Sequence, residues 1–590
     1  MTAINEEGVY HRGPSQQAQD TKQSTQNILS DMHKDWPNDA GFDNLDEHRG
    51  PIPLTVKGTI PDFAAGALYR TGPGQSKLDD MSHGRTHYVS HWFDGFAHTH
   101  RFDIVPDSEN TGKTVVDYSS RRNSEAYVKA VKEKGWRSAI TVGQRSDPCI
   151  GIFAKTMAIF QPIPRRGLDY NVVVNANYPA LSRLKTEGPL ELGHRRTPGP
   201  RNIFISSDMS NVQELHPDTL EHIGYTGQNR LRADLGGELS GAHAQIDPKT
   251  GDRINFNLKV GPGATYRVFS VSATTGETEI LATIPAGTDA PPAYIHSMFL
   301  TEHYAILALP SSRLGWNGLK IVWQRTIIDS FLPFSEDLET LWFVVDRFHG
   351  KGVVARFSTP AGFFFHSINA FEEKEGVTED GEERVAIIAD LSAYETTDIV
   401  SSFYYDVLLD REDGFQKFWS DEQRRKGSVP NIKRFKFSLP PLSSSAAPDA
   451  GLSNPLLSGS LLINIPNPHG GELPSINPLY SCKPYRYVYS LPLRGMSTVM
   501  DCIVKTDLET KEAVFWSGPR GSQPGEPIFV PRPGGESEDD GVLLTVVLDG
   551  VKETSYLLCL DARTMQEMGR AEADFAVAVG FHGIHVPPQS

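Results

Sequence analysis

The segment Asp247-Pro-Lys-Thr-Gly251, followed by the run Tyr266-Arg-Val-Phe-Ser-Val271, gives the clearest indication of the fold. A turn rich in Asp, Pro and Gly precedes a strand of β-branched and aromatic residues. Similar turns recur at His216-Pro-Asp-Thr-Leu220, Thr506-Asp-Leu-Glu-Thr510 and Asp561-Ala-Arg-Thr-Met565. Hairpins at this frequency, without a strict sequence repeat, are typical of propeller blades rather than of a row of separate domains. The sequence therefore predicts an all-β fold with the architecture of a β-propeller.

The rest of the chain divides around this pattern. Residues 1–45 are rich in Gln, Asp, Asn, Ser and Glu and have few spaced hydrophobic residues, which predicts a flexible N-terminal arm. Residues 46–590 carry the strand pattern and are expected to form the propeller domain. Within it, residues 438–455 are rich in Pro, Ser and Ala, which predicts a mobile loop insertion.

Residues 316–348 depart from the strand rhythm because they are unusually apolar, with Trp316, Trp323 and Phe331 among them. Charged residues interrupt the stretch too often for it to span a bilayer. One interpretation is a partly exposed patch that touches a membrane surface and admits an apolar substrate. The other is an ordinary buried blade with a loop.

Composition excludes several classes of protein. A net charge of −16 argues against nucleic-acid binding, which needs clustered Lys and Arg, so we expect no nucleic-acid partner. The cysteines at 149, 482, 502 and 559 lie far apart, which favours reduced thiols in an intracellular protein. The polar N-terminus does not resemble a signal peptide, and no run of about 18 apolar residues occurs. We expect a cytoplasmic or peripherally membrane-associated protein.

Four of the 19 histidines lie in similar settings, at the edge of an expected strand: His243, His296, His366 and His582. His582 stands in Gly580-Phe-His-Gly583, where the glycines let the backbone approach a bound ion. Any one of these histidines alone is more often a hydrogen-bonded core residue than a ligand. If strand ends of successive blades meet at the propeller axis, however, all of them would converge on one metal ion.

The histidine segments and several other motifs resemble those of the carotenoid cleavage oxygenases, a family that includes retinal-forming and stilbene-cleaving dioxygenases and the retinoid isomerase of the visual cycle. The resemblance begins near Pro51 and continues to the C-terminus. It is carried by these motifs together with the four histidine segments: Leu68-Tyr-Arg-Thr-Gly-Pro-Gly74, His91-Trp-Phe-Asp-Gly-Phe96, Glu472-Leu-Pro-Ser-Ile-Asn477 and Gly525-Glu-Pro-Ile-Phe-Val530.

The resemblance implies a seven-bladed β-propeller with a cap of helices and loops over an Fe(II) ion on its axis. The iron ligands would be His243, His296, His366 and His582. In the family, three of the ligand histidines donate a hydrogen bond from their other ring nitrogen to a carboxylate. These carboxylates map onto Glu472, Glu526 and Asp208, and at the last position many relatives have Glu. One methylene shorter, Asp208 is expected to reach its histidine through a backbone shift or a water molecule. His585 matches no family role and is expected to be exposed.

The reaction implied by the resemblance is the O2-dependent cleavage of a C=C bond into two carbonyl products, in a dry tunnel that selects the bond. Trp92, Phe363, Phe364 and Phe365 are candidate tunnel residues, although an aromatic run is more often plain core. Stilbene-cleaving relatives carry a Lys before the acid that aligns with Asp208, whereas this chain has Ser207. This difference favours an apolar polyene, and the motifs are similar to those of fungal enzymes that cleave torulene or β-carotene.

Three alternatives to a carotenoid dioxygenase remain at this stage. A stilbene-cleaving dioxygenase would act on resveratrol-like phenols. A retinoid isomerohydrolase would convert an ester without consuming O2. A non-catalytic propeller that binds protein partners would hold no iron.

Overall fold

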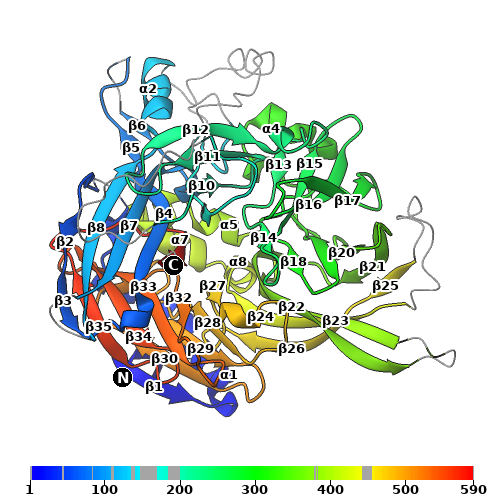
Figure 1. The fold of residues 1–590 in the computed structure, drawn as a ribbon. Coiled ribbons are helices and arrows are strands. Elements are labelled where there is room, and N and C mark those ends of the chain that lie inside the picture. The colour runs from blue at the N-terminus through cyan, green and yellow to red at the C-terminus, as the bar shows by residue number, and fades with distance from the viewer. Residues whose placement is uncertain are drawn as a thin grey trace.

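Seven sheets of four to six strands stand around a central axis (Figure 1). The structure is a computed structural model that describes residues 3–588 except for 43–44, 83, 85, 108–111, 135–139, 146–168, 184–198, 378–380, 382 and 441–454. The expected seven-bladed β-propeller is confirmed, and each sheet is one blade.

In hydrogen-bonding order, four of the blades contain the following strands. They are β12 (His222–Gly227), β11 (Asn211–Leu215), β10 (Ile203–Ser206) and β9 (Val173–Ala176); β13 (Leu239–Ser240), β15 (Arg253–Lys259), β16 (Thr265–Val271) and β17 (Thr278–Pro285), with β14 (Gln245–Ile246) beside β15; β18 (Phe299–Leu300), β19 (Tyr304–Leu309), β20 (Thr340–Asp346), β21 (Val353–Thr359) and β25 (Leu456–Ser458); and β22 (Phe363–Val377), β23 (Glu383–Tyr394), β24 (Asn431–Ser438) and β26 (Ser460–Pro466).

The other three blades each combine strands from the two ends of the chain. They are β1 (Gly8–Arg12), β30 (Ala513–Ser517), β29 (Ile503–Asp507), β28 (Tyr487–Leu491) and β27 (Glu472–Ser475); β3 (Thr55–Gly58), β35 (Glu567–Glu572), β34 (Thr554–Asp561), β33 (Gly541–Asp549) and β31 (Ser522–Pro524), with β32 (Ile528–Pro531) beside β33; and β2 (Ile52–Pro53), β8 (Thr114–Arg122), β7 (Phe96–Pro106), β4 (Gly66–Gln75) and β36 (His582–Val586). A short hairpin, β5 (Lys77–Leu78) and β6 (His87–Tyr88), stands apart.

The turns predicted from the sequence connect strands through side-chain caps. The Asp247 carboxylate accepts hydrogen bonds from the backbone N–H groups of Lys249 and Thr250 at 2.7 and 3.1 Å. Asp507 and Asp561 hold their turns in the same way. An Asp side chain that replaces a backbone acceptor stabilises a tight turn, which is why the motif marks the hairpins.

The ring is closed by β36, which pairs antiparallel with β4 so that His582 faces Thr71. At Gly583 a Cβ atom would lie 2.6 Å from the carbonyl oxygen of Tyr69. The glycine beside His582 therefore accommodates the backbone of β4, whereas the sequence had suggested that it makes room for an ion.

Short helices cover one end of the ring. The connection between β23 and β24 forms α5 (Ile399–Ser402), α6 (Tyr405–Leu408), α7 (Gly414–Trp419) and α8 (Glu422–Gly427), of which α5, α7 and α8 are seen within the ring in Figure 1. Phe403 and Tyr405 extend from this cap into the main hydrophobic core. Among the described residues, three further α-helices are α1 (Gln17–Ile28), α2 (Glu125–Lys134) and α4 (Leu319–Gln324).

The described part of the N-terminal arm, predicted to be flexible, contains a strand and a helix that contact the propeller. Strand β1 pairs with β30, and α1 packs against the same side of the molecule. Asp20 on α1 is buried and accepts hydrogen bonds from Arg12 and His469. Long-range polar contacts hold the arm, and hydrophobic spacing along the sequence does not reveal them. Of the predicted loop at 438–455, residues 441–454 lie outside the described residues.

Candidate metal centre

Four histidines from four parts of the chain meet at the propeller axis. His243 lies between β13 and β14, His296 precedes β18, His366 is on β22 and His582 is on β36. One ring nitrogen from each lies within 4.8 Å of the others. Among the described residues this is the one group of His, Cys, Asp or Glu side chains with such a geometry.

The nitrogens that face the centre are arranged as lone-pair donors. His582 Nε2 lies 3.1 Å from His243 Nε2 and 3.1 Å from His366 Nε2. Nδ1 of His366 and of His582 faces a carboxylate, so Nδ1 carries the proton and Nε2 is left with a lone pair. Two imidazole lone pairs at this distance repel each other unless a cation lies between them. The donor set therefore fits a metal ion.

Burial keeps imidazoles at this site neutral. It lowers the pKa of His243 and of His582 well below the ordinary value, and neighbouring histidines of the cluster lower both further. Neutral imidazole is the form that binds a metal. His243 and His582 consequently need no proton loss at neutral pH before they can accept an ion.

Three of the histidines bond to carboxylates. His296 Nδ1 lies 2.8 Å from Asp208 Oδ1, His366 Nδ1 lies 2.5 Å from Glu472 Oε2, and His582 Nδ1 lies 2.8 Å from Glu526 Oε1. Among the described residues, no carboxylate hydrogen-bonds to the remaining histidine, His243. Carboxylates in these positions orient the rings and increase their basicity toward a metal.

Asp208 reaches His296 directly, and neither a water molecule nor a longer side chain is needed. Its other oxygen, Oδ2, accepts a hydrogen bond of 2.7 Å from the Tyr294 hydroxyl. Tyr294 was not among the predicted site residues. Its position two residues before His296 in an extended segment places both side chains on the same side, which is the sequence feature that could have indicated it.

The carboxylate of Glu526 is held by two chain segments. It accepts a hydrogen bond of 2.8 Å from the Gly583 N–H, and Arg70 Nη1 lies 3.7 Å from its Oε2. Burial raises the pKa of Glu526 to about 7, while Arg70 and the Gly583 N–H act in the opposite direction. A cation at the histidine cluster would further favour the ionised form.

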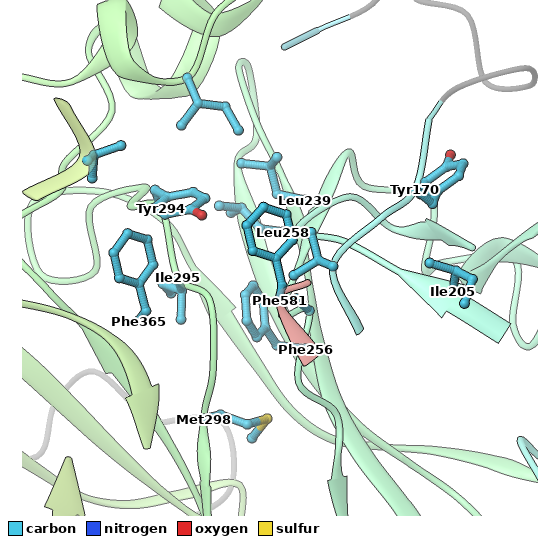
Figure 2. Packing of buried hydrophobic residues seen from close by; sticks show 14 of the residues in the cluster. Tyr170, Ile205, Leu239, Phe256, Leu258, Tyr294, Ile295, Met298, Phe365 and Phe581 are labelled. Atoms are coloured by element: carbon cyan, nitrogen blue, oxygen red, sulfur yellow. The ribbon is translucent and has the colours of Figure 1, made fainter. Parts of the chain in front are cut away.

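A narrow cavity of about 40 Å³ lies beside the histidine cluster. It is lined by His296, His366 and His582, by Glu472, and by these mostly aromatic residues: Trp92, Phe93, Val172, Phe365, Tyr394, Phe403, Leu473, Met500 and Phe581. Figure 2 shows Phe365 and Phe581 within the buried cluster that includes Tyr294. We call this space the metal cavity.

Two of the predicted tunnel residues line the metal cavity and two do not. Trp92 and Phe365 line it. Phe364 points to the opposite side of β22, where its ring packs near Trp342 and Phe299, because successive residues of a strand face opposite ways. Phe363 lies on the same side of β22 as Phe365 but two residues earlier, where its ring packs against Tyr294.

His585 lies away from the metal cavity, as its lack of a family role suggested, but it is not exposed. Its Nε2 lies 3.0 Å from the carbonyl oxygen of Ala64, and burial lowers its pKa. It is a partly buried structural histidine on the strand that carries His582.

Comparisons with known proteins agree with this geometry. The sequence model of the retinal pigment epithelial membrane protein family matches residues 41–587. The chain is 51% identical over 590 residues to a torulene dioxygenase of Gibberella fujikuroi, covering 99% of this chain and 100% of that protein. It is 47% identical over 585 residues to a carotenoid dioxygenase of Neurospora crassa, covering 96% and 94% of the two chains.

Among solved structures, a variant of the apocarotenoid oxygenase of Synechocystis superposes with a TM-score of 0.66 at 22% identity, covering 94% of this chain and 98% of that one. This likeness supports the propeller fold. The family match over residues 41–587 and the 51% identity over 99% of the chain lead to one conclusion: the chain belongs to the family of the retinal pigment epithelial membrane protein and the carotenoid oxygenases.

Proposed function

We propose that this protein is a non-heme Fe(II) dioxygenase that uses O2 to cleave a C=C bond of a carotenoid or apocarotenoid. The two carbonyl products are aldehydes of the apocarotenoid type. The observation that carries the proposal is the histidine cluster opening onto a cavity lined largely by aromatic residues. A polyene is long and apolar, and a lining of this kind can contact it without a charged group.

The metal is a single Fe(II) ion, held by His243, His296, His366 and His582. Imidazole ligands suit iron, and the donor set described above supports a cation at this point. Iron bound there would supply the activation of O2. Asp208, Glu472 and Glu526 keep the ligand rings in position, and the aromatic walls exclude water and align the polyene.

The substrate class is a torulene- or β-carotene-like polyene. Relatives that are 51% and 47% identical are named torulene dioxygenase and carotenoid dioxygenase, and a rat relative at 27% identity is named β,β-carotene 15,15'-dioxygenase. No Lys or Arg is among the described residues that line the metal cavity, so a phenolate would find no cation there.

A stilbene-cleaving activity is the alternative. The cavity lining opposes it more strongly than Ser207 does, because Ser207 lines a neighbouring polar pocket and not the metal cavity. An isomerohydrolase activity is the third outcome that the experiment below separates.

Peripheral membrane association is part of the proposal. Trp316 and Trp323 are 62% and 46% exposed, and Leu319 on α4 and Leu332 are exposed beside them in sequence. The later part of the 316–348 stretch is not a patch, because β20 is largely buried. No helix among the described residues is long and apolar enough to cross a bilayer. We also propose an intracellular location, since the described cysteines are free thiols.

The patch is tested by co-sedimentation with phosphatidylcholine vesicles. We expect the wild-type protein to bind and the double variant Trp316→Ser, Trp323→Ser to lose at least half of this binding. A matched double variant at exposed residues elsewhere, Leu479→Ser with Val551→Ser, should bind like the wild type. Equal binding by all proteins would contradict membrane contact through α4.

The function is tested by anaerobic loading with Fe(II), followed by incubation with torulene, β-carotene and resveratrol under 18O2. Labelled aldehydes from a polyene would support the proposal, and their masses would identify the cleaved bond. Cleavage of resveratrol alone would favour the stilbene alternative. Absence of 18O from every product would remove the dioxygenase assignment.

A further inference from the structure

Leu473 combines backbone strain with a place in the wall of the metal cavity. Its φ angle is +49°, in the left-handed region that disfavours residues with a side chain. The next residue is Pro474, and a proline further restricts the residue before it to extended conformations. Of the described non-glycine residues with positive φ, Leu473 is the one that lines this cavity.

The conformation places the Leu473 N–H on the carboxylate that orients His366. Between Glu472 and Ser475 the pairing of β27 with β28 shifts register, as in a β-bulge. The turned N–H donates a hydrogen bond of 2.7 Å to Glu472 Oε2, the same oxygen that lies 2.5 Å from His366 Nδ1. Glycine would supply this N–H without strain. The backbone contact therefore does not explain why a leucine stands here.

The position of the side chain gives a reason for a leucine at residue 473. Leu473 is an aliphatic residue in a wall that is otherwise mostly aromatic, and it lines the same space as His366 and Tyr394. Leu473 is adjacent to Glu472 and bonds to its carboxylate, so this part of the wall is directly connected to the group that bonds to His366. Strained residues that the surroundings hold in place are found where a function needs them.

We infer that Leu473 is a specificity-determining residue whose side chain decides which double bond of the polyene lies beside the histidine cluster. The inference rests on the proposed function. A methyl-branched polyene can slide along a smooth aromatic wall, and a fixed branched side chain near the metal stops it in one register.

The experiment compares Leu473→Ala with Leu473→Gly in the Fe(II)-loaded full chain. Both variants remove the branched part of the side chain and keep the N–H, but only glycine also removes the Cβ atom and so relieves the backbone strain. We expect both to release aldehydes from neighbouring double bonds of β-carotene or torulene, raising the share of these products at least fivefold over the wild type. Iron content should stay unchanged, and Leu473→Gly should melt at a higher temperature than Leu473→Ala.

Leu220 provides the matched control because it is a buried leucine with a φ of +57° outside the cavity. Leu220→Ala and Leu220→Gly should change the melting temperature and leave the product pattern unaltered. A single wild-type product pair from both Leu473 variants would overturn the inference alone. A wild-type enzyme that cleaves no polyene would overturn the proposed function and this inference with it. Loss of iron in both Leu473 variants would show a purely structural role and also overturn it.

Discussion

At the scale of single residues, the orientation of each imidazole depends on what its outer nitrogen bonds. Asp208, Glu472 and Glu526 each hold one ring and are themselves held by a second donor or a neighbouring charge: the Tyr294 hydroxyl, the Leu473 N–H, and the Gly583 N–H with Arg70. Each of these three histidines is thus bonded to a carboxylate, and each carboxylate accepts a further hydrogen bond from a backbone N–H or a tyrosine hydroxyl.

Removal of a ligand should abolish metal binding. We expect His296→Ala or His366→Ala to retain no stoichiometric Fe(II) and to lose turnover while the far-UV circular dichroism spectrum stays that of the wild type. His585→Ala, on the strand that carries His582, is the control and should bind iron normally. Full activity in either ligand variant would remove the metal assignment.

Removal of the negative charge of Glu526 should weaken iron binding less than removal of a ligand histidine does. Glu526→Gln keeps the shape of the side chain but weakens its bond to His582 Nδ1, so we expect iron affinity to fall by about 10- to 100-fold. Competition with a chelator measures the affinity, and activity at saturating iron should be reduced. Glu567→Gln, which removes a surface ion pair with Arg570, should leave both unchanged. An unaltered affinity in Glu526→Gln would show that this carboxylate does not orient the ligand.

At the scale of elements, the N-terminal strand and helix are held mainly by polar pairs. Asp20 on α1 receives hydrogen bonds from Arg12 and from His469 of the propeller, and Ser24 donates to the carbonyl oxygen of Leu493 at 2.7 Å. Apolar spacing along the sequence predicted a flexible arm here, because the propeller partners His469 and Leu493 lie more than 400 positions away in the chain. The same reasoning identified the Asp-capped turns, whose partners are two or three residues away.

Asp20→Asn should loosen the arm. The variant leaves Arg12 buried without a charged partner, which costs about 3 kcal/mol. We expect faster hydrogen exchange of the β1 and α1 amides and earlier proteolytic cleavage in this region at pH 7. Unchanged exchange would mean that the pair contributes nothing to the docking of the arm.

The effect should depend on pH. Burial alone would raise the pKa of Asp20, but the hydrogen bonds from His469 and Arg12 lower it overall. Because the folded pKa is lower than the unfolded one, this stabilisation is present above the unfolded pKa, near 4, and is lost as the pH falls through the folded pKa. The difference between the wild type and Asp20→Asn should therefore shrink below about pH 4, as measured by hydrogen exchange.

At the scale of the whole molecule, the histidine cluster connects blades that are distant in sequence, so metal binding should stabilise the entire ring. An ion that binds only the folded state adds about 2.7 kcal/mol at a concentration 100 times its dissociation constant. We expect the melting temperature to rise with Fe(II) under anaerobic conditions and to return to the metal-free value with a chelator. His366→Ala should show no such rise, and an equal rise would place the metal elsewhere.

The ring and its cluster of histidines could be predicted from sequence because strand ends in a propeller converge and because the motifs resemble a known family. The placement of Phe363 and Phe364 could not, since it depends on which face of β22 meets the cavity. The hydrogen bond from Tyr294 to the distant Asp208 and the bulge at Leu473 depend on the folded chain, so neither contact could be predicted from the sequence.

The pairing of β36 with β4 also has a consequence for biosynthesis. Strand β4 leaves the ribosome early, but its partner, with His582, is translated more than 500 residues later. Until then the edge of β4 stays unpaired, and an open sheet edge invites wrong pairing. Late synthesis of β36 therefore prolongs the exposure of this edge, and a metal ion can meet all four histidines only after β36 has emerged from the ribosome.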